Sequence, residues 1–232
     1  MAIELIAHRG APRECRENTL PAFQRALELQ ADGIELDTHV TSDGVVVVHH
    51  DPIPRAQSPT SGVAGKPFAA LTARETATFR FPDGSHIPTL SEVADLVGDR
   101  AVLYVELKAR AIEGAVLDCL RATRTRHALH SFDHAAIQRT HQRAPGVRTG
   151  ILTASYLLDP AAALRSAGAQ DYWQSVEFVD RALVDRVHAA GGRVIAWTVN
   201  SADDIAAVRA AGVDGICSDD LRAFQPLTEQ RA

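Results

Sequence analysis

The sequence has few of the features that mark disulfide-rich, zinc-binding or membrane proteins. Its three cysteines, Cys15, Cys119 and Cys217, are odd in number, far apart and in no metal-ligand spacing. They exclude a disulfide framework and a zinc ribbon, and they indicate a reducing compartment. No apolar run approaches the roughly 18 residues that a membrane span requires, and the first strand-like segment begins too early to leave room for a signal peptide. We therefore expect a soluble cytoplasmic protein with no stable membrane insertion.

Lysine is also scarce, because only Lys66 and Lys108 stand among the 24 basic residues. A net charge of -5 gives no reason to expect nucleic acid as a partner. Hydrophobic residues make up 46% of the chain and charged residues 23%, which excludes a disordered protein. A chain of 232 residues suits one large α/β domain over 1–232.

Strand-like and helix-like segments alternate along the chain, which is typical of a TIM-type (β/α)8 barrel. There are nine strand candidates for the eight places of such a barrel, so one strand must be extra. The predicted strands are 3–7, 33–37, 45–49, 101–107, 127–131, 148–152, 172–176, 194–198 and 215–218. The predicted helices are 19–30, 90–97, 112–123, 135–143, 161–167, 181–190 and 202–211.

The extra strand belongs to the pair formed by 33–37 and 45–49. Asp43-Gly44 between them is a strong hairpin signal, and no helix fits in so short a connection. A register centred on this dipeptide places Asp37 opposite His50. Residues 52–88 hold six prolines and predict a small irregular insertion after the third strand, with one short helix near 72–78.

Carboxylates and cations close several of the predicted strands. Glu35 and Asp37 end one strand, and Glu106 and Lys108 end another; in each pair the alternation of side chains puts both members on one face. The carboxyl ends of barrel strands meet at the mouth, where three carboxylates would repel one another without a cation. Oxygen ligands without a Cys or His cluster favour Mg²⁺ or Ca²⁺ over zinc.

Two histidines stand at the same end of the barrel. His8 closes the first strand beside Arg9, and His50 follows the third; imidazoles there can act as acid and base. Arg9 and Lys108 are suited to holding an anion. His49 competes with His50, and the hairpin register favours His50. Together these groups indicate phosphoryl chemistry.

Each assignment has a structural alternative. Glu35 and Asp37 can belong to salt bridges at the barrel rim, and Glu106 and Lys108 can form a structural ion pair. Trp197 is a core aromatic residue or a substrate wall with about equal weight. Asn18 and Thr19 are interpreted as a helix cap, which leaves Glu17 undecided. The remaining histidines are interpreted as surface or structural residues: His39, His86, His127, His130, His134, His141 and His188.

Ten ordered motifs, spread over almost the whole chain, resemble the glycerophosphodiester phosphodiesterases. They are HRG at 8–10, ENT at 17–19, IELD at 34–37, DG at 43–44, VVHHD at 47–51, IPTL at 87–90, VELK at 105–108, SFD at 131–133, WTVN at 197–200 and GVDGI at 212–216.

The resemblance implies a TIM-type barrel that hydrolyses a small-molecule glycerophosphodiester to glycerol 3-phosphate and an alcohol. Roles carried over by motif make Glu35, Asp37 and Glu106 the ligands of one divalent cation. They make His8 and His50 the acid/base pair. Substrate and phosphate are held by Arg9, Lys108, Trp197 and Phe132. The glycerol 2-hydroxyl would attack phosphorus to form a cyclic phosphate, which water then opens.

The chain departs from the family pattern at two places. Arg16 stands where Pro is common before Glu17, and Cys217-Ser218-Asp219 replaces the late Thr-Asp. Neither change is expected to touch the catalytic groups. Two other functions remain open at this stage: a lysophospholipase D-like phosphodiesterase on the same scaffold, and a barrel that binds phosphodiesters without turnover.

Overall fold

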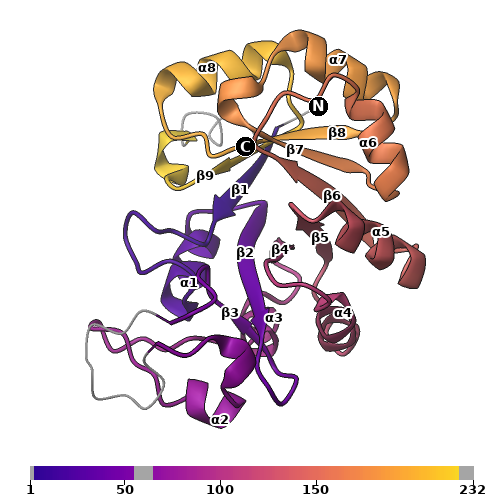
Figure 1. Cartoon of the computed structure of the whole chain (residues 1–232). Helices are drawn as coiled ribbons and strands as arrows, with labels where there is room; N and C mark the ends of the chain where they lie inside the picture. Colours follow the sequence, from indigo (N-terminus) through magenta and orange to yellow (C-terminus); the bar gives the residue numbers. More distant parts are fainter. Residues whose placement is uncertain (1–2, 55–64, 225–232) are drawn as a thin grey trace.

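Eight parallel strands close into a barrel in the computed structural model, which describes residues 3–54 and 65–224 (Figure 1). The strand order is β1-β9-β8-β7-β6-β5-β4-β2, and pairing of β1 with β2 closes the ring. The predicted TIM-type fold is confirmed.

The elements keep the alternation that the sequence predicts, with most boundaries within one or two residues. The strands are β1 Glu4–His8, β2 Gly33–Val40, β3 Val46–Val48, β4 Val102–Leu107, β5 His127–Ser131, β6 Arg148–Thr153, β7 Asp171–Ser175, β8 Arg193–Trp197 and β9 Gly215–Ser218. The α-helices are α1 Leu20–Glu28, α2 Ala73–Thr76, α3 Leu90–Val97, α4 Glu113–Arg121, α5 His134–Arg143, α6 Pro160–Ala167, α7 Arg181–Ala189 and α8 Ala202–Ala211. Three short 3-10 helices are η1 Phe68–Ala70, η2 Val176–Phe178 and η3 Leu221–Phe224.

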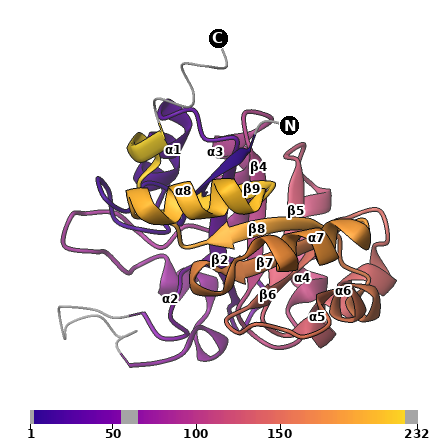
Figure 2. The same cartoon turned by 90° about the horizontal axis from the view of Figure 1, so that it is seen from above.

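The helices lie around the strands in both views (Figures 1 and 2). Their apolar faces pack on the outward side chains of the strands in one large core, with residues such as Phe23, Leu36 and Val105 fully buried. Burying one such side chain contributes about 1.5–3 kcal/mol. No helix of the described residues is long and apolar enough to cross a bilayer.

The interior of the barrel is layered. An ionic floor at the amino ends of the strands includes Glu4, Asp171 and Arg193, and Arg193 bonds to Glu4. Above it lies a dry apolar layer, and above that a polar layer at the carboxyl ends. The layering follows from the alternation of side chains along each strand. The apolar layer consists of Ile6, Tyr104, Ala128, Leu152, Trp173, Ile195 and Cys217.

β3 is the extra strand, and it pairs antiparallel with β2 outside the closed ring. The predicted insertion follows it, and its described part carries η1 and the short helix α2, close to the predicted 72–78. Phe68, Leu71 and Phe79 form a small separate core with Val47. Residues 55–64 of the predicted insertion lie outside the described residues.

The predicted hairpin register is wrong by one residue. Thr38 pairs with Val48, so Asp37 lies opposite His49, whose backbone N–H donates to the Asp37 carbonyl (3.0 Å). The connection between β2 and β3 is longer than a two-residue turn and is centred on Asp43. Within it, the Thr41 hydroxyl donates a hydrogen bond to the Asp43 carboxylate (2.6 Å). The Asp-Gly dipeptide therefore predicted the hairpin but not its register.

Candidate active site

A cavity of about 220 Å³ lies at the carboxyl end of the barrel. Side chains from the ends of the strands and from the segment after β3 line it, as expected for a TIM barrel. The lining consists of His8, Arg9, Glu35, His50, Glu106, Lys108, His130, Phe132, Leu152, Trp173, Trp197 and Cys217. All but one of the predicted site residues are in this set, and the exception, Asp37, lies buried beside it.

His8 is anchored by a carboxylate that the sequence did not single out. Its Nδ1 lies 2.6 Å from Asp219 Oδ1, and its Nε2 lies 3.9 Å from Glu35 Oε2. Burial would lower the pKa of His8, but the bond to Asp219 and the charge of Glu35 outweigh it, so the pKa is raised. The expectation that the 217–219 segment touches no catalytic group is wrong, because β9 is the neighbour of β1.

We expect Asp219→Asn to lower kcat about 10²-fold with little change in KM, since an amide can also donate to Nδ1 and no longer fixes the tautomer of His8 as the carboxylate does. Steady-state kinetics check this. Asp220→Asn is the matched control, because that neighbouring carboxylate bonds Arg222 and makes no contact with His8. An unchanged kcat for Asp219→Asn would show that His8 needs no anchor.

His50, and not His49, lines the cavity. The chain leaves the strand after Val48 and bends at His50, whose Nδ1 bonds the Asp51 carboxylate (2.9 Å). His39 supports the bend through its Nε2, 3.1 Å from the His50 carbonyl oxygen. His49 packs against Phe68 instead, and burial lowers its pKa to about 4. The choice of His50 from the sequence therefore agrees with the cavity, although the register argument behind it was wrong.

Asp37 is held inside a cage of donors. Arg9 Nε lies 3.1 Å from Oδ2, Asn18 Nδ2 donates to the same oxygen (2.8 Å), and Lys108 Nζ lies 3.5 Å from Oδ1. These charges keep the pKa of Asp37 below its ordinary value despite burial. Arg9 also pairs with Glu17 (3.1 Å). Asn18 is thus a site residue; the helix-cap interpretation is wrong for it, because Thr19 occupies the cap position.

Glu35 and Glu106 both line the cavity, and both side chains are buried. Burial and the nearby charges of Asp37 and Glu35 raise the pKa of Glu106 to about 8, although Lys108 Nζ lies 3.2 Å from its Oε1. Oδ1 of Asp37 is buried and accepts no hydrogen bond from the described residues. Two buried carboxylates at one cavity, with Asp37 beside them, are the kind of oxygen donors that a divalent cation binds, so the donor set fits such an ion.

His130, which the sequence analysis interpreted as a surface or structural residue, lies at the cavity and not on the surface. It lies on β5 opposite Glu106 in register, it is buried, and it lines the cavity. Glu35, Glu106 and His130 each offer one ligand atom, and these atoms lie within 4.8 Å of one another. The available signal was alternation along β5, which puts Ala128 and His130 on the inward face.

Aromatic side chains form the outer wall. Phe132 is 47% exposed and meets Trp197 edge to face, with ring centroids 5.5 Å apart. Trp197 Nε1 is buried and has no hydrogen-bond partner among the described residues. The position of Trp197 at the cavity favours the substrate-wall interpretation over a core aromatic.

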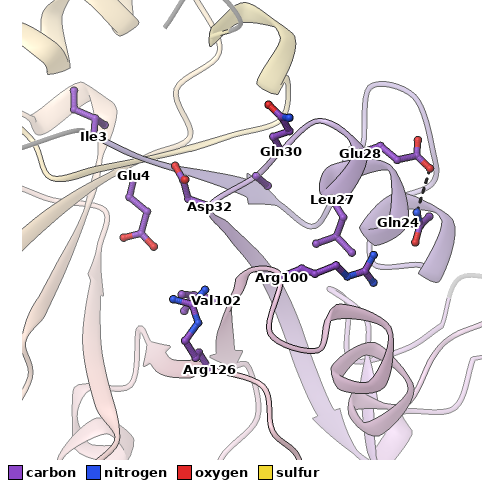
Figure 3. Close-up of a pocket in the computed structure, with 11 residues that line it drawn as sticks. Ile3, Glu4, Gln24, Leu27, Glu28, Gln30, Asp32, Arg100, Val102 and Arg126 are labelled. Carbon is purple, nitrogen blue, oxygen red and sulfur yellow. Dashed lines mark hydrogen bonds between the residues drawn. The ribbon is translucent and has the colours of Figure 1, made fainter. Parts of the chain in front are cut away.

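A second cavity, of about 870 Å³, lies at the opposite end of the barrel (Figure 3). It opens beside Glu4 and Val102 at the amino ends of their strands, and Arg100 and Arg126 reach it from the surface. Its carboxylates already have partners: Glu28 accepts from Gln24 (3.2 Å) and Glu4 accepts from Tyr104 (2.7 Å). We assign the chemistry to the smaller cavity because the imidazoles of His8 and His50 and the buried carboxylates of Glu35 and Glu106 line it.

The closed parallel barrel, with imidazoles, carboxylates and cationic side chains gathered in a cavity at its carboxyl end, has the architecture of a TIM-barrel enzyme. Residues 8–223 match the model of the glycerophosphoryl diester phosphodiesterase family, and the chain belongs to this family. It is 32% identical over 229 residues to a glycerophosphodiester phosphodiesterase of Caldanaerobacter subterraneus subsp. tengcongensis, covering 93% of each chain. It is 30% identical to one from Bacillus altitudinis, covering 93% of this chain and 94% of that protein.

Solved structures agree with the fold. The glycerophosphodiester phosphodiesterase of Thermotoga maritima superposes with a TM-score of 0.82 at 25% identity, covering 98% of this chain and 99% of that one. A phosphodiesterase of Oleispira antarctica, solved in complex with the product sn-glycerol-3-phosphate, superposes with a TM-score of 0.86 at 21% identity, covering 98% and 97%.

Proposed function

We propose that this phosphodiesterase hydrolyses glycerophosphodiesters to glycerol 3-phosphate and an alcohol, with His8 and His50 as its acid/base pair and a divalent cation as cofactor. One observation carries the proposal: two imidazoles, each bonded through Nδ1 to a carboxylate, line one cavity with two carboxylates and two cations. The glycerol 3-phosphate bound to the Oleispira antarctica phosphodiesterase supports the choice of product.

The protein groups divide the reaction between them. Arg9 and Lys108 hold the anionic phosphate at the cavity wall. One histidine removes the proton of the glycerol 2-hydroxyl as its oxygen attacks phosphorus, and the other protonates the leaving alkoxide. A cyclic phosphate forms, and water opens it with the roles of the two histidines reversed. Phe132 and Trp197 cover the apolar side of the substrate.

Glu35, Asp37 and Glu106 are the proposed cation ligands, and the ion they were expected to bind is Mg²⁺ or Ca²⁺. Such an ion supplies positive charge where negative charge develops on the phosphoryl oxygens. Burial and the charges of Asp37 and Glu35 raise the pKa of Glu106 to about 8, which supports a need for positive charge at this position.

We expect release of glycerol 3-phosphate from glycerophosphocholine or glycerophosphoethanolamine, its complete loss in EDTA, and its return when a divalent cation is added back. A coupled assay for glycerol 3-phosphate, run with each diester and each metal, measures this. Full activity in chelator would overturn the cation dependence. Faster hydrolysis of a lysophospholipid would favour the lysophospholipase D-like alternative, and absence of turnover with every diester and metal would favour a binding protein.

A further inference from the structure

His130 is a buried imidazole with no hydrogen-bond partner among the described residues. Its side chain is 2% exposed, and its Nδ1 makes no hydrogen bond. Its Nε2 lies 3.6 Å from Glu35 Oε1, just beyond hydrogen-bond distance. Leaving a buried polar group unpaired costs about 1–3 kcal/mol. Nε2, which faces Glu35, is the nitrogen that an ion shared with that carboxylate would bind.

The plane of the ring is set by stacking on Trp173, with centroids 4.3 Å apart and planes 15° apart. Gly150 leaves room for the indole of Trp173, because a Cβ there would lie 2.9 Å from it. In this plane Nε2 is the ring nitrogen that faces the Glu35 carboxylate.

Two carboxylates complete the surroundings of this nitrogen. Glu106 lies opposite His130 on the adjacent strand β4, and Glu35 lies on β2. One atom from each of the three side chains lies within 4.8 Å of the others, close enough for one ion to contact all three. His8 Nε2 is also near Glu35, 3.9 Å from Oε2, but that nitrogen has the proton-transfer role in the proposed function.

The chemistry of a mixed donor set differs from that of carboxylates alone. Mg²⁺ and Ca²⁺ favour oxygen ligands, whereas an imidazole nitrogen suits later divalent ions of the first transition row. One nitrogen among two carboxylates therefore shifts the preference of a site toward those ions.

We propose that His130 is a ligand in the cation site and that its nitrogen makes the site prefer a transition ion such as Co²⁺ or Zn²⁺ over Mg²⁺ and Ca²⁺. The inference rests on the cation site of the proposed function and names the class of ion that fills it. It also assigns a role to a histidine that the sequence motifs pass over.

Calorimetric titration of the metal-free protein with Co²⁺, Zn²⁺ and Mg²⁺ separately, without substrate, tests this. His130→Gln replaces the imidazole with an amide of similar size. We expect it to weaken binding of Co²⁺ and Zn²⁺ about 10- to 100-fold and to leave Mg²⁺ affinity almost unchanged. His127→Gln is the matched control, because His127 starts the same strand and bonds the Thr125 carbonyl.

A second measurement needs no variant. In histidine-ring NMR spectra of the wild-type protein, we expect the His130 Nε2 resonance to shift on addition of one equivalent of Zn²⁺ and not of Mg²⁺. An unmoved resonance would overturn the proposal and leave His130 as a core residue. Equal loss of affinity for all three ions in His130→Gln would overturn the proposed preference for transition ions. The titration and the NMR experiment use no substrate, so their outcome does not depend on catalysis. Absence of phosphodiesterase activity in a separate assay would therefore count against the proposed function and not against this proposal.

Discussion

Replacement of His50 by alanine is expected to lower kcat about 10²- to 10⁴-fold, the usual effect of removing a general acid or base. The expected loss of kcat follows from the position of His50 at the cavity. His50 lines the cavity with Nδ1 bonded to Asp51, which leaves Nε2 as the nitrogen available for proton transfer. Glycerol 3-phosphate release under saturating substrate measures the loss. Added imidazole is expected to restore part of the activity, because the deleted group borders an open cavity.

His49→Gln is the matched control for this prediction. His49 is adjacent in sequence but is buried against Phe68 and Phe81, and its pKa is lowered to about 4, so it stays uncharged near neutrality. We expect this variant to keep kcat and to lose about 1–3 kcal/mol of stability. The reverse pattern, with activity kept in His50→Ala and lost in His49→Gln, would move the proton-transfer role to His49.

Glu106→Gln is expected to abolish activity and, in the metal-free protein, to stabilise the fold above neutral pH. The pKa of Glu106 is raised to about 8, so the folded chain holds a proton that the unfolded chain has released. Between the unfolded pKa, near 4.5, and about 8, the wild-type protein therefore loses stability as the pH rises. Glutamine carries no charge, so the variant does not lose stability over this pH range. Near pH 9 its free energy of unfolding is expected to exceed that of the wild type by about 2 kcal/mol.

Urea unfolding in chelator, at about pH 5 and about pH 9, measures the free energy of unfolding of the wild type and of Glu106→Gln. Glu113→Gln provides the contrast, because Glu113 is a buried glutamate that is bonded to Arg139 (2.7 Å) and does not line the cavity. That variant is expected to lose stability at both pH values. If Glu106→Gln is less stable than the wild type at high pH, the site does not concentrate negative charge as described.

The site shows clearly which contacts could be anticipated. Glu35, Glu106 and His8 were placed at the mouth because each ends an apolar strand, and strand ends meet at one rim in a parallel barrel. The sequence did not predict the roles of Asp219 and Asn18, because each contacts its partner only through the tertiary fold. Asp219 lies 211 positions from His8 in the chain, and only closure of the barrel between β9 and β1 brings the two together.

The sequence by itself determined the order of the elements, the extra hairpin strand and the family. These depend on periodicity, turn residues and ordered motifs, which are local properties of the chain. Tertiary structure decided the rest: the hairpin register, the choice of His50 over His49 at the cavity, and the entry of His130 into the carboxylate cluster. A shift of one residue turns a side chain to the opposite face, and that choice depends on packing between segments distant in the chain.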